Sequence, residues 1–528
     1  MEHPSLTRRD ALKVSLLGAA ALALPWQTVL SAKRASRIAT SRLPRPYTVP
    51  FTVPPVLTPI QVGDTDYYRV VQQPFTGVIL PGVTTPLWGY NGLVPGPTIK
   101  ATRGRRVVVR QVNALPAVHP VLGYTPWTST HLHGMPSEPQ FDGYASDITM
   151  PGQWKDYHYP NNCEARTLWY HDHGVHHTAQ NVYMGLAGQY HLTDPVEAAL
   201  PLPRGSYDVP LTIADRMFAE DGSLLWDDND QSALNGDVIL VNGQPWPTMK
   251  VARRKYRFRI LNGSLGRGYR LRLSNGQPFQ VIATDGGLMA APQTVSQITV
   301  GMAERYEIVV DFAGLAPGQK VQLVNLGVKN SIDYDHTGKI MQFEVTADPF
   351  DPANNAVPAV LAAPHPAMTL KVAQSTATRR MRLKRDGVLW TINGRTWADV
   401  EASGFTEIFA NPAPGAVEIW EVENSSGGWF HPLHIHLVDF QVLSRNGRPP
   451  RPEERGPKDV VYVGENETVR LIMRFSTPDG PHGRYMIHCH NLTHEDHDMM
   501  VQFQVGAHDS SCDPLNTAPP RSGAEDPL

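Results

Sequence analysis

An Asn-Gly pair recurs at a fixed interval and is the strongest constraint on how this chain folds. The pairs are Asn91-Gly92, Asn242-Gly243 and Asn393-Gly394, and each step between them is 151 positions. Each pair is followed by a strand-like segment that ends in asparagine: "RRVVVRQVN" (105–113), "RKYRFRILN" (254–262) and "AVEIWEVEN" (416–424). Such self-similarity predicts three copies of one domain, each of roughly 150 residues.

The repeated segments have the period of β-strands. In the second segment Tyr256, Phe258 and Ile260 alternate with Arg257 and Arg259, which predicts a half-buried strand. Similar alternation recurs in "RLRL" (270–273) and "VRLIMRF" (469–475). The 47 prolines and 43 glycines favour a turn-rich protein. We therefore predict an all-β fold, built from sandwiches or barrels.

Shifts in composition indicate where the domains begin and end. The clearest linker is rich in Pro, Ala and Asn, and a weaker boundary lies near 194–205. The predicted parts are a first domain at 41–197, a second at 205–347, a linker at 348–375, a third domain at 376–508 and a tail at 509–528. The second copy has no dense histidine cluster, so it is either a spacer or a domain that shapes access to a site formed by the others.

Residues 1–40 have the features of an export signal. Arg8-Arg9 precedes a mild apolar run from Val14 to Leu24, which is too short to cross a bilayer as a helix. A twin-arginine signal fits this pattern, and it predicts export to the periplasm or the extracellular space; a disordered basic tail is the alternative. With a net charge of -3, the chain is not expected to bind nucleic acid or an anionic membrane surface. No stable membrane insertion is expected.

Histidines gather in four clusters, two in the first repeat and two in the third. They are "HLH" (131–133), "HDH" (171–173), "HPLHIH" (431–436) and "HCH" (488–490), the last followed by His494. Residues i and i+2 of a strand project from one face, so each H-x-H pair directs two imidazoles the same way. One such pair is often only solvated, but four pairs predict a centre with more than one metal ion.

The ligand types identify the metal as copper. Two imidazoles, a thiolate and a weak axial thioether describe a blue-copper electron-transfer site, and His431, His494, Cys489 and Met499 supply them. Eight further histidines suffice for two ions with three ligands each and a third with two: His131, His133, His171, His173, His434, His436, His488 and His490. Zinc also accepts imidazoles, but a zinc hydrolase does not need a multi-metal cluster tied to a thiolate site.

The tripeptide His488-Cys489-His490 predicts how the two sites are joined. On an extended backbone the cysteine faces away from both of its neighbours. One tripeptide can therefore hold a copper on one face and two coppers on the other. This arrangement would provide a short covalent path for electrons.

Together these motifs resemble the three-domain blue multicopper oxidases over nearly all of the chain that follows the signal. Within that family the chain looks most like the bilirubin oxidases and the bacterial spore-coat laccases. The segments that carry the resemblance are "TLWYHDH" (167–173), "NGDVILVNGQPWP" (235–247), "RKYRFRILN" (254–262), "GMAERYEIVVDF" (301–312), "HPLHIHLVDFQV" (431–442) and "HCHNLTHEDHDMM" (488–500). The resemblance implies three cupredoxin-like Greek-key domains, of the sandwich or barrel type, and four copper ions.

The resemblance also implies a role for each ligand. The type 1 copper would be held by His431, Cys489 and His494 with Met499 as the axial ligand, and family spacing favours Met499 over Met500. The type 2 copper would be held by His131 and His434. The coupled type 3 pair would be held by His133, His171, His173, His436, His488 and His490.

Three further residues gain roles from the resemblance. Glu495 and Asp142 occupy positions that are acidic in this branch of the family, which implies proton relays; ordinary surface acids are the alternative. Trp429 stands two residues before His431, where bilirubin oxidases have an aromatic residue. It would line the surface that binds the electron donor, or else be a packed core tryptophan.

The implied function is an oxidase that takes single electrons from phenols, aromatic amines or a tetrapyrrole and reduces dioxygen to water, as a monomer. A metallo-oxidase acting on Cu(I), Mn(II) or Fe(II) is the alternative enzyme. The absence of a methionine-rich run among the 15 methionines makes it less favoured. A copper-storage protein is a third possibility, but storage does not require a thiolate site coupled to a histidine cluster.

Several residues fall outside this scheme. His119 and His365 are isolated in the sequence, and we interpret them as surface residues. His497 has no role among the ligands. Cys163 and Cys512 could form a disulfide in an exported protein, or they could be free thiols.

Overall fold

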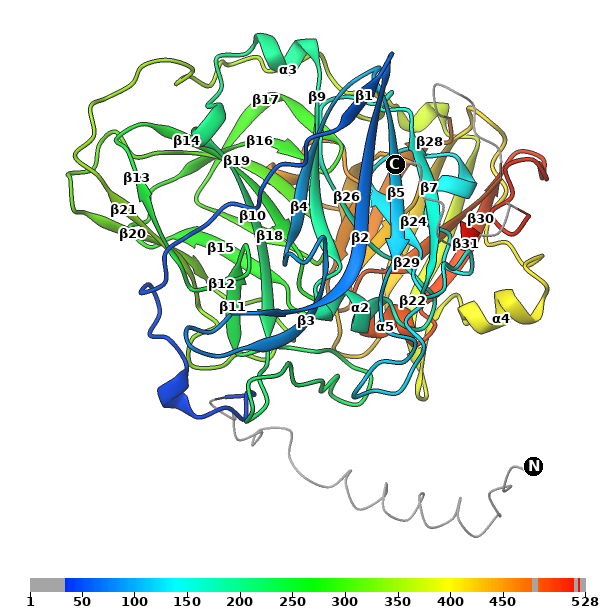
Figure 1. The fold of residues 1–528 in the computed structure, drawn as a ribbon. Helices are drawn as coiled ribbons and strands as arrows, with labels where there is room; N and C mark the ends of the chain where they lie inside the picture. Colours follow the sequence, from blue (N-terminus) through cyan, green and yellow to red (C-terminus); the bar gives the residue numbers. More distant parts are fainter. Residues whose placement is uncertain (1–33, 477–482, 517–520, 523–528) are drawn as a thin grey trace.

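Strands dominate the structure, a computed structural model that describes residues 34–476, 483–516 and 521–522 (Figure 1). In these residues the strands form six sheets, two in each of three domains. Most of the predicted export segment at 1–40 lies outside the described residues. Within the described ranges, no helix has the length and apolar character needed to cross a bilayer.

The first domain is a sandwich of two sheets. Its elements are β1 (Ile60–Val62), β2 (Thr65–Gly77), β3 (Thr85–Tyr90), β4 (Gly96–Thr102), β5 (Arg106–Asn113), β6 (Thr130–His133), β7 (Gln153–Tyr159), β8 (Arg166–Asp172), β9 (Ala187–Thr193), α2 (Thr178–Met184), α3 (Pro195–Ala199) and the C-terminal β31 (Arg521–Ser522). One sheet has the order β1-β2-β5-β7-β31, with β3 added beside β2. The other has the order β4-β9-β8-β6. The end of the chain thus returns to the first domain.

The second domain also consists of two sheets, one of seven strands and one of five. Its strands are β10 (Asp208–Arg216), β11 (Val238–Val241), β12 (Gln244–Pro245), β13 (Thr248–Val251), β14 (Lys255–Asn262), β15 (Tyr269–Leu273), β16 (Phe279–Thr284), β17 (Gly287–Val295), β18 (Gln297–Val300), β19 (Arg305–Asp311), β20 (Lys320–Asn325) and β21 (Lys339–Val345). The sheet orders are β12-β11-β10-β14-β19-β16-β17 and β13-β21-β20-β15-β18. After β21 the predicted linker contains two short 3-10 turns, Pro366–Thr369 and Val372–Gln374.

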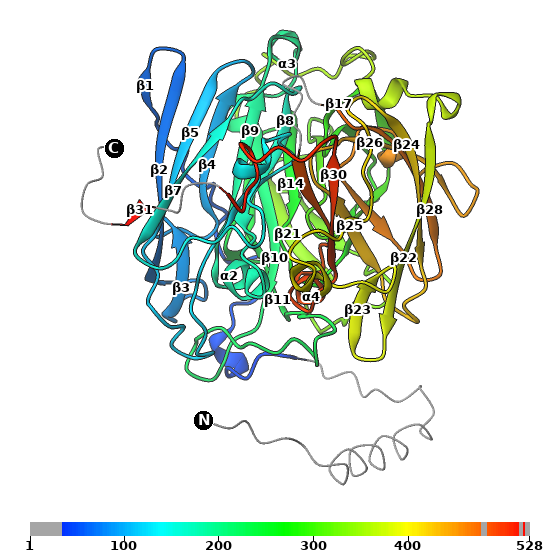
Figure 2. The same cartoon turned by 90° about the vertical axis from the view of Figure 1, so that its right-hand side faces the viewer.

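The third domain repeats the sandwich. Its elements are β22 (Ala377–Asp386), β23 (Leu389–Ile392), α4 (Trp397–Ala402), β24 (Val417–Asn424), β25 (His431–Ile435), β26 (Phe440–Arg445), β27 (Val460–Val463), β28 (Thr468–Arg474), β29 (Gly483–Cys489), α5 (Leu492–Asp496) and β30 (Met500–Val505). The sheet orders are β23-β22-β24-β28-β26 and β27-β25-β29-β30. Figure 2 shows the blue-to-cyan first domain and the yellow-to-red third domain side by side, and α2 packs against α5 where they meet.

The sequence repeat corresponds to one three-stranded unit that occurs in every domain. The unit is β3-β2-β5 in the first domain, β11-β10-β14 in the second and β23-β22-β24 in the third, with one antiparallel and one parallel pair each. The asparagine-ended strands β5, β14 and β24 begin within one residue of their predicted positions. The predicted repeat of β-strands is therefore confirmed.

Both asparagines of the repeat have a structural task. Each Asn-Gly pair has positive φ at both residues, as in Asn91 (55°) and Gly92 (69°), which is the backbone of a type I′ turn. The second asparagine ends the strand that follows and is buried in every domain. In the second domain the Asn262 side chain donates to the carbonyls of Arg267 and Val300 and accepts from the amide of Ser264. One side chain thus satisfies three backbone groups that water cannot reach.

The expectation of a half-buried strand at 254–262 is wrong. Both faces of β14 are buried, and Arg257 and Arg259 are 3% and 2% exposed. The two guanidiniums lie against the first domain, where both pair with Glu197, and they also pair with Glu307 on β19. A charged face can be buried here because each cation has carboxylate partners. Alternation in the sequence cannot distinguish this face from a solvated one.

We predict that Asn262→Ala lowers the free energy of unfolding by about 2 kcal/mol, because it leaves two buried carbonyls and one amide without partners. Denaturant unfolding followed by tryptophan fluorescence measures the change. Asn275→Ala is the matched control, since Asn275 is exposed and bonds only within its own turn. Equal stability of the two variants would contradict a structural role for the repeated asparagine.

Candidate metal centre

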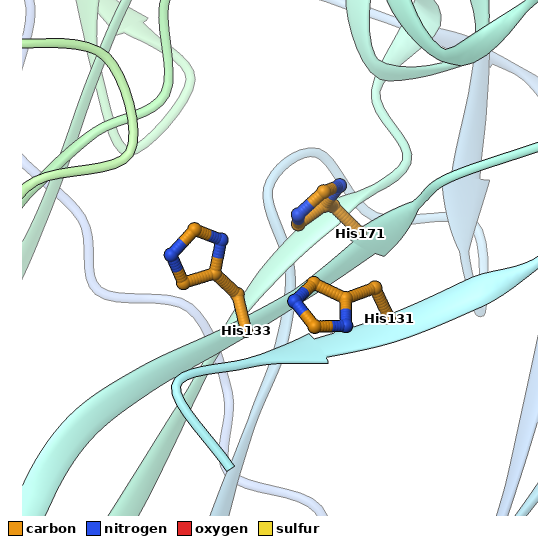
Figure 3. Close-up of side chains that lie close together, drawn as sticks. All are labelled: His131, His133 and His171. Carbon is orange, nitrogen blue, oxygen red and sulfur yellow. The ribbon is translucent and has the colours of Figure 1, made fainter. Parts of the chain in front are cut away.

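The histidine clusters meet where the first and third domains adjoin. β6 pairs with β8 so that His131 lies opposite His171, and β25 pairs with β29 so that His434 lies opposite His488. Figure 3 shows the rings of His131, His133 and His171 turned toward one another above the two strands. Alternate residues of these strands present their imidazoles on one face, as expected for H-x-H pairs.

Eight histidines of the two domains form one buried cluster. Ligand nitrogens lie within 4.8 Å of one another in three overlapping groups: His131, His133 and His171; His131, His434 and His436; and His173, His436 and His488. The ring of His490 joins them, with its centroid 5.3 Å from that of His171. The Nε2 atoms of His173 and His436 each lie 3.1 Å from Nε2 of His488.

The nitrogens of this cluster fit bound metal. Burial, reinforced by neighbouring imidazoles, lowers the pKa of His171 to about 3. Burial likewise lowers the pKa of His173 to about 4, so both rings are neutral at pH 7 with a free lone pair. Nε2 of His131, His171 and His434 and both nitrogens of His490 are buried and have no hydrogen-bond partner. Leaving so many polar atoms unpaired is costly unless an ion binds them.

A second group of ligands lies on the other side of β29. Sγ of Cys489 is 3.2 Å from Nδ1 of His431 and 3.6 Å from Nδ1 of His494, and all three side chains are fully buried. Met499 is tied to this group through its backbone, since its amide donates to the carbonyl of His494. Its side chain packs in the same core cluster as Cys489, whereas Met500 packs in a different one. Packing thus agrees with the preference for Met499 over Met500.

The two groups are one residue apart along the chain. His488 belongs to the histidine cluster and Cys489 to the thiolate group, as expected for neighbours on opposite faces of β29. Thiolate and imidazole donors favour a soft or borderline ion in the second group, and imidazoles alone suit copper or zinc in the first.

The two carboxylates singled out in the sequence are both buried and face the histidine cluster. Oδ2 of Asp142 lies 2.8 Å from Nδ1 of His436, and Oε2 of Glu495 lies 2.8 Å from Nδ1 of His488. Burial raises the pKa of Asp142 well above its usual range. The alternative of ordinary surface acids is therefore excluded by their positions.

Sequence reasoning missed Asp459, which supports the cluster from the end of the loop before β27. Its Oδ1 lies 3.1 Å from Nε2 of His133, and its carbonyl lies 2.9 Å from Nδ1 of His434. Arg305 of the second domain pairs with both oxygens of Asp459 and is itself fully buried. The segment "GMAERYEIVVDF" contains Arg305, but a lone arginine gives no signal of a contact made across domains.

The second domain also reaches the thiolate group. The carbonyl of Ser232 lies 2.7 Å from Nε2 of His494 and accepts from the side chain of Asn491. The second domain thus contacts both groups of ligands and is more than a spacer. Trp390, also missed, stacks on His494 with ring centroids 3.7 Å apart. Trp429 is half-buried, and its ring lies 5.9 Å from that of His494.

Comparison with known proteins places this architecture in one family. Family models described as multicopper oxidase match residues 74–197, 208–332 and 365–509. Bilirubin oxidase from Albifimbria verrucaria is 43% identical over 485 residues, which cover 87% of this chain and 81% of that protein. The chain belongs to the multicopper oxidases.

Other relatives agree with this assignment. A laccase from Bacillus subtilis is 35% identical over 513 residues. The aligned region covers 86% of this multicopper oxidase and 97% of the laccase. The crystal structure of the multicopper oxidase McoA from Aquifex aeolicus matches with a TM-score of 0.77 at 31% identity, covering 87% of this chain and 99% of that one. The predicted all-β fold of three cupredoxin-like domains is confirmed, and the protein is a copper-dependent oxidoreductase.

Two histidines of this multicopper oxidase are not the surface residues we expected. His119 is buried, and its Nδ1 accepts from the amides of Val121 and Leu122. His365 is buried in the linker, at a junction described below. Isolation in the sequence says nothing about burial, because the contacts of both residues depend on the local turn and the tertiary fold.

Within the described ranges, the remaining cysteines of this oxidase form no disulfide. Cys163 is buried, with Sγ 3.9 Å from Sδ of Met135, and Cys512 is partly exposed near the C-terminus. Nε2 of His497 lies 3.6 Å from Oδ2 of Asp228, at the edge of the second domain.

Because burial lowers the pKa of these histidines, acid should unfold the copper-free oxidase. The pKa of His431 falls to about 3, and those of His171 and His173 to about 3 and 4, against about 6.5 in the unfolded chain. Below pH 6.5 the unfolded chain binds protons that the folded chain does not. Stability is therefore full above that pH and is lost as pH falls toward 4.

The expected loss is about 1.4 kcal/mol for each pH unit and each such histidine. Denaturant unfolding of copper-free protein at several pH values measures it. His508→Gln serves as a control, because His508 is exposed, and should leave the slope unchanged, whereas His431→Gln should reduce it. Stability that stays constant from pH 6.5 to 4 would contradict the neutral, buried state of these imidazoles.

Proposed function

We propose that this multicopper oxidase holds four copper ions and couples one-electron oxidation of phenols, aromatic amines or a tetrapyrrole to the reduction of dioxygen to water. The observation that carries the proposal is the position of Cys489 between two histidines that belong to a different ligand group. A protein that only bound copper would not need two ligand groups joined through adjacent residues.

The ligand assignment of this proposal follows the two groups. His431, Cys489 and His494, with Met499 as axial ligand, would hold the type 1 ion. His131 and His434 would hold the type 2 ion. The type 3 pair would be held by His133, His171, His173, His436, His488 and His490. Copper in these groups would accept single electrons at the thiolate and pass them to oxygen at the histidine cluster.

The chain's own residues supply the path and the protons. Each turnover consumes four electrons and four protons for one dioxygen and releases two waters. Electrons leave the Cys489 sulfur along one residue of backbone to His488 or His490. Protons are assigned to Asp142 and Glu495, because both carboxyls lie beside cluster histidines. The third carboxyl there, Asp459, has both of its oxygens paired with Arg305.

Electron donors are proposed to approach the thiolate group beside Trp429. Its half-buried ring lies 5.7 Å from that of Trp390, which in turn stacks on His494. An aromatic surface of this kind suits flat organic donors, and the names of the relatives, bilirubin oxidase and laccase, agree with that class. Export through the twin-arginine route, to the periplasm or beyond, and a monomeric state stay predictions.

Oxygen uptake by the copper-loaded protein tests the proposed function. We expect uptake with phenols and with bilirubin, at four donor electrons per dioxygen and without release of hydrogen peroxide. Faster turnover with Cu(I), Mn(II) or Fe(II) than with any organic donor would favour the metallo-oxidase alternative. No uptake with any reductant, despite four bound coppers, would contradict an oxidase and support storage.

Glu495→Gln should keep the blue colour and slow oxygen reduction by about 100-fold, because the amide keeps the shape of the side chain but cannot relay a proton. Reoxidation of the fully reduced protein at limiting oxygen measures the effect. Asp498→Asn is the matched control. Asp498 is a nearby acid, and the charged groups around it, among them His176 and His497, are not assigned ligands. Turnover at the parent's rate in Glu495→Gln would argue against a proton role.

A further inference from the structure

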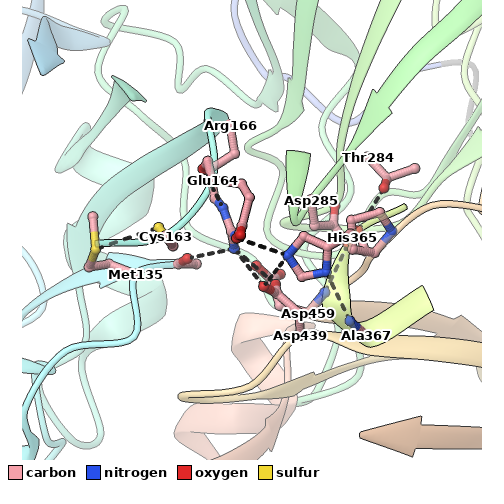
Figure 4. Close-up of polar contacts among 12 residues, drawn as sticks. Met135, Cys163, Glu164, Arg166, Thr284, Asp285, His365, Ala367, Asp439 and Asp459 are labelled. Carbon is pink, nitrogen blue, oxygen red and sulfur yellow. Dashed lines mark hydrogen bonds and ion pairs between the residues drawn. The ribbon is translucent and has the colours of Figure 1, made fainter. Parts of the chain in front are cut away.

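A cluster of four polar side chains occupies the junction of the first domain, the linker and the third domain. The side chains are Glu164, Arg166, His365 and Asp439, and Figure 4 shows them converging from three segments that are far apart in the sequence. Arg166 donates to Asp439 at 2.9 Å, and Nε2 of His365 lies 3.1 Å from Glu164 and 3.4 Å from Asp439. None of these residues is among the copper ligands assigned above.

Two hollows meet at this cluster. The inner one has a volume of only about 10 Å³, room for roughly one water molecule, and is lined by His131, His434 and Arg166. The outer one has a volume of about 320 Å³ and is lined by Glu164 and His365. Asp439 lines both hollows, together with Pro136, Leu437 and Val438. Asp439 has the one polar side chain among these four shared residues.

The inner hollow leads directly to ligand atoms. Nε2 of His131 and Nε2 of His434 are buried without a hydrogen-bond partner, and both residues line this space. The outer hollow is rimmed by exposed side chains, among them Arg103 and Arg474. A path from solvent to the His131–His434 end of the cluster would pass a narrow point between the two hollows, and Asp439 is the polar residue there.

Asp439 is held in place from three directions. Arg166, fully buried on β8, pairs with it and also donates to the carbonyl of Gly134, next to the ligand His133. From the second domain Gly286 approaches so closely that a Cβ there would lie 2.8 Å from Oδ1 of Asp439. Such a position favours glycine because any side chain would displace the carboxylate.

His365 supplies the third of these contacts, and its orientation follows from its hydrogen bonds. Nδ1 accepts from the amide of Ala367, at the start of the 3-10 turn Pro366–Thr369. Nε2, which faces the carboxylates of Glu164 and Asp439, therefore carries a proton. The hydrogen bond from His365 is the main cause that lowers the pKa of Glu164 to about 2, so Glu164 stays charged at neutral pH.

We propose that this cluster is the gate through which water passes between solvent and the His131–His434 end of the copper centre, with Asp439 as the gate residue and Arg166 and His365 as the residues that position it. The inference rests on the proposed function, because the reaction must release two waters and admit four protons at a buried site. A carboxylate at the narrow point admits water and its protons and repels small anions.

Access to the inner hollow tests the gate without copper. Met135 lines that hollow, so a cysteine introduced there by Met135→Cys, in a Cys163→Ala background, reports entry of the small reagent methyl methanethiosulfonate. The labelling rate at position 135 is measured by peptide mass mapping on copper-free protein. We expect it to rise several-fold in His365→Ala, which removes one side of the gate, and to stay near the parent's rate in His365→Gln, which keeps the size of the side chain.

Azide binding to the copper-loaded protein gives the second readout. Asp439→Asn removes the charge at the narrow point and should raise the association rate of azide, followed by its absorbance, about tenfold. Asp208→Asn is a matched control: its side chain is 18% exposed against 17% for Asp439, and it pairs with Arg259 at 2.8 Å as Asp439 pairs with Arg166 at 2.9 Å. It lies at a different junction of domains and lines neither hollow.

The outcomes of these measurements distinguish a gate from a purely structural cluster. Faster azide binding in Asp439→Asn with faster labelling in His365→Ala, and no change in Asp208→Asn, supports the gate. Unchanged labelling in His365→Ala, or an equal rise in Asp208→Asn, overturns it, since the cluster would then be only a latch between domains. Azide rates in Asp439→Asn that stay at the parent's value overturn the link to the ligands. Failure of the parent to take up oxygen contradicts the proposed function alone, because labelling requires no copper.

Discussion

Burying eight imidazoles at one junction is possible only if the rings stay neutral and find partners other than water. The rest of this structure follows from that constraint. No single sheet could supply so many histidines on one face, so β6 and β8 of the first domain must meet β25 and β29 of the third. The lone pairs that remain, among them both nitrogens of His490, form a site that copper fits and solvent does not.

A junction of this kind needs a rigid frame, and the second domain supplies it through buried charges. Arg305 pairs with Asp459, and Lys458 beside it lies 2.9 Å from Asp285 and 3.1 Å from Glu304. Removing one partner from such a network leaves an unpaired buried charge, which costs far more than a surface salt bridge contributes. The network therefore fixes the position of Asp459, and with it the orientation of His133 and His434.

Sequence patterns revealed the parts of this protein that depend on local period. The H-x-H pairs, the opposite direction of Cys489 and the repeated Asn-Gly turns all follow from backbone geometry within a few residues. The partners of Arg257 and Arg305 could not be found in this way, because a strand with arginines on one face looks the same whether that face meets water or another domain. His365 was misjudged for a related reason. Its neighbours Glu164 and Asp439 lie 201 and 74 positions away.

On the proposed function, electrons and water would use different junctions to reach or leave the centre. The thiolate group is covered by Ser232 and bordered by Trp390 and Trp429, where the second and third domains adjoin. The hollow at Asp439 opens instead where the first domain meets the linker. The thiolate group and the histidine cluster are joined by the His488-Cys489 step of β29. A donor too large for the outer hollow would thereby be confined to the thiolate side, while water would exchange at the other.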